Sequence, residues 1–373
     1  MKLYLVDGKG AKFTQPNVFN KAFENLAEGI NDRAYRKKCF REIIRLYEKL
    51  KGKSEDAFTV YHAMDDFQIR DIATVTKDSL LRIYPTLKPL YEKHFKPQPK
   101  QRYVDFNQGV DARLFNESNV KLLASIAIRP LRIAFDDLKC RPAYEKAVRL
   151  SVRAGIKDFS NYLLYNYKDS PEELYIRLRI NVDLCDELGV SIYSFPMKYH
   201  PIHNEVGAEI DYSHNRDYIG VNWNRKYIRA IQAILNSTKG KVGKGTSFFE
   251  EAFGKDLAEF KELLEMPETF ILYRFFFKWL DNVINFGTEH WRVCWRECMR
   301  TLDETTKNEI LDIIHSNNFD DERIKEFDNP LVKELFGYYS SHRNDIIDSQ
   351  SELYKLKKQY DANPTIALKR KKS

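Results

Sequence analysis

The chain has 373 residues, 43% of them hydrophobic and 13% aromatic, which is ample for a real core and suggests about two domains. Its five cysteines are odd in number and widely spread, which argues against a disulfide framework and favours a reducing compartment, so we expect a cytoplasmic protein. The densest apolar run, residues 270–280, contains Arg274 and Lys278, which excludes a membrane span.

The first predicted element is a β-strand at residues 2–7, Lys-Leu-Tyr-Leu-Val-Asp, followed by a glycine break at Gly8 and Gly10. If almost no residues precede the first strand of a parallel sheet, the apolar edge of that strand is exposed. Natural proteins usually cover such an edge or pair it with another strand. We therefore expect a further segment before Met1.

Residues 8–100 are predicted to be a helical insertion. The range 33–51 is an amphipathic helix, because Cys39, Ile43 and Leu46 fall on one face and basic residues on the other. A second helix is expected at residues 78–94. A crossover between neighbouring strands needs only one helix, so this insertion is longer than the sheet requires. We interpret it as a candidate lid or docking surface.

Four further segments have the composition of buried strands, and each begins a βα unit. They are Tyr103–Phe106, Leu131–Phe135, Phe159–Tyr165 and Val190–Phe195. Their starts follow one another at intervals of about 30 residues, the length of a strand, a crossover helix and two loops. Helix start and stop signals support this interpretation. The clearest are the capping box at Ser170-Pro-Glu-Glu173 and the helix-terminating Gly189.

These segments predict an α/β fold with a βα barrel core at residues 101–210, built on a parallel sheet of five visible strands that includes residues 2–7. From residue 211 to residue 373 the sequence predicts helices and a basic tail. The Lys-Arg-Lys-Lys run at 369–372 is more typical of a solvated tail than of a nucleic-acid contact. Ligands of parallel βα proteins bind at the carboxyl ends of the strands, where this chain is unusually polar.

Several of these segments together resemble the radical S-adenosylmethionine (SAM) enzymes. The resemblance rests on Phe106–Arg113, Arg129–Asp136, Ser160–Tyr165 and Ser194–Pro201, and it covers residues 1–7 and about 101–250. It implies a partial TIM barrel with one strand more than this chain shows, SAM bound along the strand ends, and a [4Fe-4S] cluster. The part that is missing here is the first strand with its cluster loop.

The resemblance also implies cofactor-binding residues. The resemblance places Asp7 and Gly8 where the protein contacts the amino group of SAM, and it places Asp136 where the protein contacts the ribose hydroxyls. Polar groups of SAM or of the substrate are expected at Gln108, Asp111 and Arg113, because an arginine suits the carboxylate of the methionine moiety. The remaining candidates lie along the last two strands. They are Asn161, Asn166, Ser194, Pro196 and Lys198.

The three-cysteine motif C-x-x-x-C-x-x-C is absent from the sequence. Cys294 and Cys298 form the only close pair, and their spacing places them on one helix face. Because a cluster needs three thiolates, we predict no metal site and name no catalytic residue in this chain.

Three function classes follow from these observations. The first is a radical SAM enzyme of unknown substrate whose cluster is supplied by an N-terminal segment or a separate chain. The second is a cluster-free binding or regulatory paralogue. The third is a basic RNA-binding scaffold.

Overall fold

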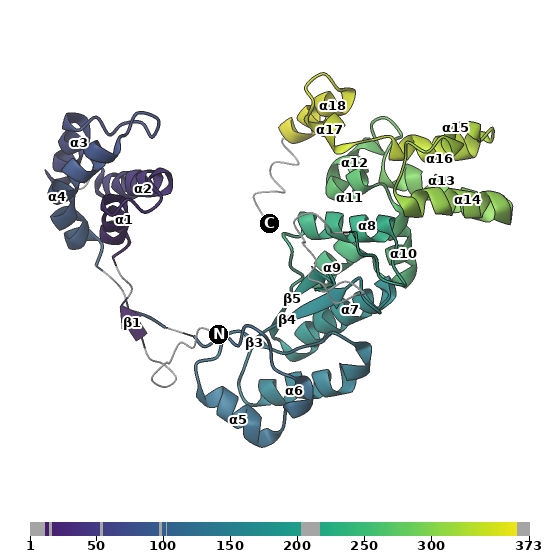
Figure 1. The fold of residues 1–373 in the computed structure, drawn as a ribbon, viewed down its shortest axis with the longest axis horizontal. Coiled ribbons are helices and arrows are strands. Elements are labelled where there is room, and N and C mark those ends of the chain that lie inside the picture. The colour runs from purple at the N-terminus through teal and green to yellow at the C-terminus, as the bar shows by residue number, and fades with distance from the viewer. Residues whose placement is uncertain are drawn as a thin grey trace. The chain divides into compact units, whose positions relative to one another are not determined.

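Figure 1 shows a computed structural model of the chain, which describes residues 12–14, 17–52, 55–96, 99–101, 103–202 and 217–363. The chain divides into two compact units, residues 1–103 and 104–373, which we call the N-terminal and C-terminal units. Helices make up 63% of the described structure. Each unit has its own hydrophobic core, and the two cores share no residue.

The N-terminal unit contains helices and a short antiparallel ribbon. Its elements are β1 (Lys12–Thr14), α1 (Val18–Ala27), α2 (Asp32–Leu50), α3 (Glu55–Asp66), α4 (Lys77–His94) and β2 (Pro99–Gln101). The helices predicted at 33–51 and 78–94 are confirmed as α2 and α4. Their apolar faces meet in a core that includes Phe19, Ile43 and Leu87, all fully buried. The predicted strand at residues 2–7 lies outside the described residues.

The C-terminal unit begins with a parallel sheet in the order β3-β4-β5, which is also the order of the sequence. The strands and the helices around them are α5 (Glu117–Ser125), β3 (Leu131–Arg132), α6 (Arg141–Arg153), β4 (Asp158–Tyr165), α7 (Pro171–Leu188) and β5 (Ser191–Lys198). The register pairs Leu131 with Phe159 and Asn161 with Ser194. The parallel pairing of these three predicted strands is confirmed.

The predicted five-stranded partial barrel is wrong. The described residues contain three parallel strands in one open sheet, within a mostly helical structure. The segment predicted as a strand at 103–106 has no continuous ladder. Its Val104 makes an isolated parallel bridge with Ile128, and beyond the segment Val110 makes another with Ile133.

Two residues explain why this ladder is interrupted. Pro130 lies between the two bridges and lacks the backbone N–H that a continuous ladder requires. On the opposite segment Gly109 has a φ of 81°, and its N–H donates to the carbonyl of Phe106 at 2.8 Å. The chain therefore makes a tight turn directly after the predicted strand, which separates the two bridges.

Helix α7 is positioned by the caps that the sequence predicts. The Ser170 hydroxyl accepts a hydrogen bond from the backbone N–H of Glu173, whose carboxylate accepts one from the N–H of Ser170 at 2.9 Å. Pro171 occupies the first turn, and Gly189 ends the helix with a φ of 64°. These caps begin α7 shortly after the carboxyl end of β4 and lay its apolar face on the sheet.

Residues 225–362 are organised as helices, as predicted for this region. They are α8 (Arg225–Ser237), α9 (Thr246–Phe253), α10 (Leu257–Glu265), α11 (Glu268–Leu272), α12 (Arg274–Leu280), α13 (Thr288–Thr301), α14 (Glu304–Ser316), α15 (Arg323–Glu326), α16 (Pro330–Tyr339), α17 (Arg343–Ile347) and α18 (Glu352–Ala362). Their buried residues form one cluster with those of the sheet. Within the described ranges, none of the helices has both the length and the apolar character needed to cross a membrane.

Candidate functional site

The two faces of the β3-β4-β5 sheet are covered differently. One face packs on α6 and α7 and carries Phe159, Leu163 and Ile192, all buried. We call the other the open face. Its side chains, assigned from the register, are Arg132, Ser160, Tyr162, Leu164, Tyr193, Phe195 and Met197. Tyr193 and Met197 are 39% and 48% exposed among the described residues. Since parallel sheets normally have both faces covered, this exposure marks the open face as a candidate binding surface.

Arg132 organises the β3 side of the open face. Its guanidinium holds the Asp105 carboxylate through Nε at 2.8 Å and Nη2 at 3.0 Å. The remaining nitrogen, Nη1, donates to Ser160 Oγ at 3.1 Å. Pairing with Asp105 raises the pKa of Arg132, so the group stays charged. The Arg132 guanidinium and the Asp105 carboxylate therefore form a fixed ion pair at the carboxyl end of β3.

An aromatic surface continues from this ion pair toward β5. The Arg132 guanidinium lies 5.2 Å from the centroid of the Tyr162 ring, and the Phe195 ring lies 5.9 Å from the same ring. Tyr193 is flanked by Lys241, whose Nζ lies 5.3 Å from its ring centroid. Such a surface can stack a flat aromatic group beside charged hydrogen-bonding partners.

Four predicted cofactor-binding residues lie on the loops that follow the predicted strand at 103–106 and β3. Gln108 and Asp136 are exposed, and Asp136 Oδ1 accepts a long hydrogen bond, 3.5 Å, from the N–H of Leu164. Asp111 and Arg113 pair with each other, with 2.6 Å between Arg113 Nη2 and Asp111 Oδ2. The Arg113 guanidinium lowers the pKa of Asp111 to about 2. A ligand carboxylate at Arg113 would therefore have to compete with Asp111.

Asn161 and Ser194 lie on the helix-covered face, in a buried hydrogen-bond network. Asn161 Nδ2 donates to the Tyr144 hydroxyl at 2.8 Å, and this hydroxyl donates to Asn181 Oδ1 at 2.6 Å. Asn181 Nδ2 in turn donates to Ser194 Oγ at 2.8 Å. The network ties the centre of the sheet to α6 and α7. Because Asn161 and Ser194 are each 1% exposed, they do not face the open surface.

Asn166 joins the segments that follow β4 and β5. It is fully buried with a φ of 67°, and its amide donates to the carbonyls of Tyr199 and Tyr218 at 3.3 and 3.1 Å. Its Oδ1 accepts from the N–H of Gly220 at 2.8 Å. At Gly220 a Cβ atom would lie 2.4 Å from the Tyr167 carbonyl oxygen, so the close approach requires glycine. Asn166 thus connects loops at the carboxyl edge.

The other predicted residues are placed as follows. Pro196 and Lys198 pair with Leu163 and Tyr165 and so belong to the face that packs on the helices, near its carboxyl end. Both are partly buried. Asp7 and Gly8 lie outside the described residues.

A buried arginine at the carboxyl edge was missed in the sequence. Arg177 of α7 is fully buried, and its guanidinium donates to the carbonyls of Asp136 and Leu164, both at 2.9 Å. It also pairs with Asp169 at 2.8 Å. Burial raises the pKa of Asp169 and lowers that of Arg177. This one side chain fixes the spacing of the β3 and β4 ends.

The open-face residues Arg132, Tyr193 and Met197 were also missed. The available signal was strand alternation, because in β4 and β5 each open-face residue lies between two neighbours on the buried face.

The cysteines do not fit an iron-sulfur cluster. All five are free and distant in sequence except Cys294 and Cys298, which lie one turn apart on α13 and are buried. A hydrogen bond with Cys298 and burial raise the pKa of Cys294. Across the described ranges, no group of three His, Cys, Asp or Glu side chains could hold a metal ion.

Comparison with known proteins leaves the site without a counterpart. No protein-family model, no curated protein and no solved structure matches this chain.

Proposed function

We propose that the C-terminal unit binds SAM across the open face and the neighbouring loops, as part of a radical SAM enzyme whose cluster is held outside this chain. The observation that carries the proposal is the partly exposed open face of a parallel sheet, flanked by the Arg132–Asp105 ion pair and by exposed Asp136.

Each part of SAM has a chemical counterpart on this surface. The adenine ring stacks on the aromatic side chains of Tyr162 and Phe195, which lie 5.9 Å apart. The ribose hydroxyls donate to the Asp136 carboxylate, which has accessible oxygen lone pairs. The resemblance of residues 106–113, 129–136 and 194–201 to radical SAM enzymes, which suggested the role of Asp136, also supports the proposal.

Titration calorimetry of the full chain with S-adenosylhomocysteine tests the proposal, because this ligand needs no cluster. We expect weak binding, on the order of tens of micromolar to millimolar, since a few charge-assisted hydrogen bonds hold a polar ligand on a half-open surface. Phe195→Ala and Asp136→Asn should each weaken binding about tenfold.

Leu122→Ser is the matched control, because Leu122 is an exposed apolar residue of α5, 66% exposed. It should leave the affinity unchanged. Absence of binding at millimolar ligand, or binding that survives both open-face substitutions, would refute the proposed site.

A further inference from the structure

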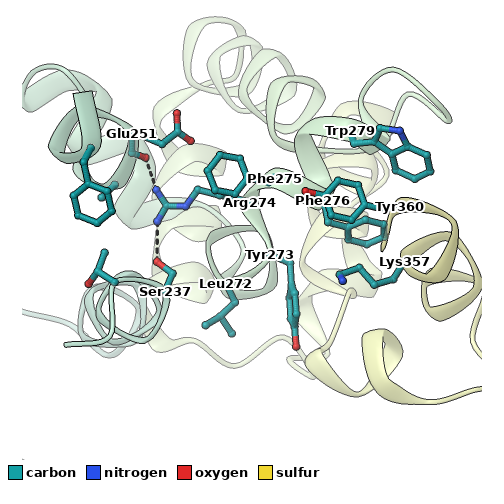
Figure 2. Close-up of a pocket in the computed structure, with 13 residues that line it drawn as sticks. Ser237, Glu251, Leu272, Tyr273, Arg274, Phe275, Phe276, Trp279, Lys357 and Tyr360 are labelled. Carbon is teal, nitrogen blue, oxygen red and sulfur yellow. Dashed lines mark hydrogen bonds between the residues drawn. The ribbon is translucent and has the colours of Figure 1, made fainter. Parts of the chain in front are cut away.

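A cavity of about 690 Å³ lies in the helical part of the C-terminal unit, on elements other than the sheet (Figure 2). Its walls come from the end of α8, from α9, from the junction of α11 and α12, and from α18. Small-molecule sites typically have volumes of roughly 300–1,000 Å³. The cavity is therefore large enough for a ligand of two or three rings.

Aromatic side chains form most of the wall. The ring of Phe276 lies 6.1 Å from that of Trp279 and 5.6 Å from that of Tyr360. Phe248 and Phe275, which also line the cavity, are 48% and 59% exposed. Large aromatic rings left in water around a cavity favour a flat apolar ligand that covers them.

Two cations stand among these rings. Figure 2 shows the Arg274 guanidinium between the Glu251 backbone carbonyl and Ser237 Oγ, the latter at 2.9 Å. Lys357 Nζ lies 5.9 Å from the Phe276 ring centroid and also pairs with Asp361.

Of the two cations, Arg274 is the one without a hydrogen bond to a carboxylate in the described structure. Both of its hydrogen-bond acceptors in the described structure are neutral oxygens, while the Glu251 carboxylate is held by Lys278 at 2.7 and 3.0 Å. Burial lowers the pKa of Arg274, which reflects the cost of burying its charge, and the nearby Glu251 carboxylate offsets only part of that cost. An anionic group delivered by a ligand would offset that cost.

We propose that this cavity binds a small molecule with a flat aromatic body and one anionic group. The rings lie against Phe248 and Phe275, and the anion pairs with Arg274. This site is separate from the open face and does not depend on SAM binding there.

Two fluorescent probes of matched shape test the proposal on the full chain. 8-Anilinonaphthalene-1-sulfonate carries an anionic sulfonate, and N-phenyl-1-naphthylamine has the same rings without it. We expect the anion to bind about tenfold tighter, the effect of one charge-assisted contact. Phe275→Ser should weaken both probes, and Arg274→Gln should abolish the preference for the anion.

Two controls locate the binding. Arg274→Lys should keep part of the preference, which separates charge from folding. Val293→Ser, on an exposed position of α13, should leave both affinities unchanged.

The proposal is overturned if the two probes bind equally well, or if binding is unaffected by Phe275→Ser and Arg274→Gln. It is also overturned if removal of residues 364–373 strengthens probe binding, because the tail of this chain would then be the occupant. Loss of probe binding with intact binding of S-adenosylhomocysteine would leave the proposed function standing.

Discussion

Tyr144 is the central residue of the buried network beneath the sheet. Tyr144→Phe would leave Asn161 Nδ2 and Asn181 Oδ1 without their partner, in a region where water cannot replace it. Each unsatisfied buried group costs about 1–3 kcal/mol, so we expect the free energy of unfolding to fall by on the order of 2–4 kcal/mol. Urea unfolding followed by circular dichroism measures this loss.

Tyr165→Phe is the matched control. Tyr165 is buried on the same face, 2% exposed, and no hydrogen bond of its hydroxyl is described. Its substitution should change stability by less than about 0.5 kcal/mol. Equal losses in the two variants would show that the network contributes nothing beyond packing.

Lys226 of α8 is fully buried, and its ammonium donates to the Met266 carbonyl. Burial lowers its pKa from 10.5 to about 8. Between these two values the unfolded chain binds more protons than the folded chain, so this residue makes stability rise with pH from about 8 to 10.5. Below about pH 8 Lys226 is charged in both the folded and the unfolded chain, so its burial lowers the free energy of unfolding by an amount that does not depend on pH.

We therefore expect Lys226→Met to stabilise the protein at pH 7 by roughly 1–3 kcal/mol, less whatever the lost Met266 contact costs. The advantage over the wild type should shrink as the pH rises toward 10.5. Unfolding of both proteins in urea at pH 7, 8.5 and 10 gives the difference. A difference that is independent of pH would contradict the expectation.

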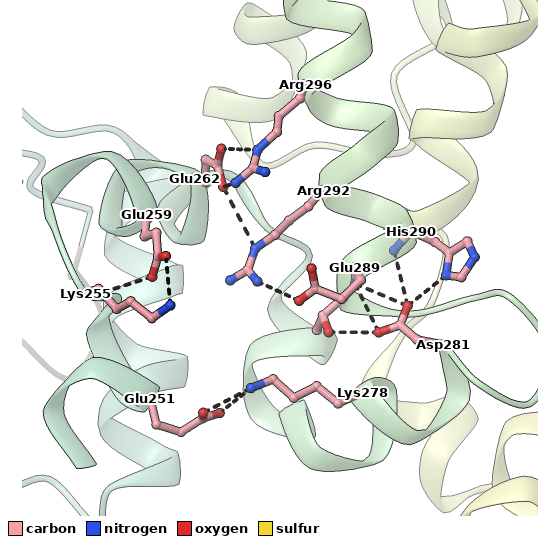
Figure 3. Close-up of polar contacts among 11 residues, drawn as sticks. Glu251, Lys255, Glu259, Glu262, Lys278, Asp281, Glu289, His290, Arg292 and Arg296 are labelled. Carbon is pink, nitrogen blue, oxygen red and sulfur yellow. Dashed lines mark hydrogen bonds and ion pairs between the residues drawn. The ribbon is translucent and has the colours of Figure 1, made fainter. Parts of the chain in front are cut away.

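At the scale of elements, α13 begins without a side-chain cap of its own. Its N-cap is Gly287, and the capping group is the Asp281 carboxylate from the end of α12 (Figure 3). That carboxylate accepts from the backbone N–H groups of Glu289 and His290 at 3.0 and 3.2 Å, and from the Thr288 hydroxyl at 3.1 Å. It therefore couples two helices as well as capping one.

Asp281→Ala should lower the free energy of unfolding by about 2–3 kcal/mol, because it leaves several helix N–H groups without an acceptor. Asp303→Ala is the comparison, since Asp303 is an exposed N-cap that serves α14 alone, and it should cost about 1 kcal/mol. Thermal melts of both variants measure the losses. Similar melting temperatures would mean that the Asp281 cap does not couple α12 to α13.

At the scale of the whole molecule, the two units have separate cores. We expect calorimetry of the full chain to show two unfolding transitions. Phe23→Ala, in the N-terminal core, should lower one transition by removing about 3–5 kcal/mol of packing, and Phe253→Ala should lower the other. A single transition that shifts in both variants would show that the units unfold together.

The sequence by itself determined the local elements of this protein. Helices α2 and α4 follow from apolar spacing, and α7 follows from the Ser170 capping box, because both signals act within a few residues. The parallel order of β3, β4 and β5 follows from their spacing along the chain, since a crossover helix must fit between them.

The tertiary structure decided what the polar residues do. Asn161 and Asp136 look alike in the sequence as polar residues of strand ends, yet one is buried against α6 and the other is exposed. The face that a side chain occupies depends on register and on which helices cover the sheet, and both are set by contacts between residues far apart in the chain. For the same reason the interrupted ladder at Val104 and the cavity around Arg274 could not be predicted: each depends on segments brought together only by folding.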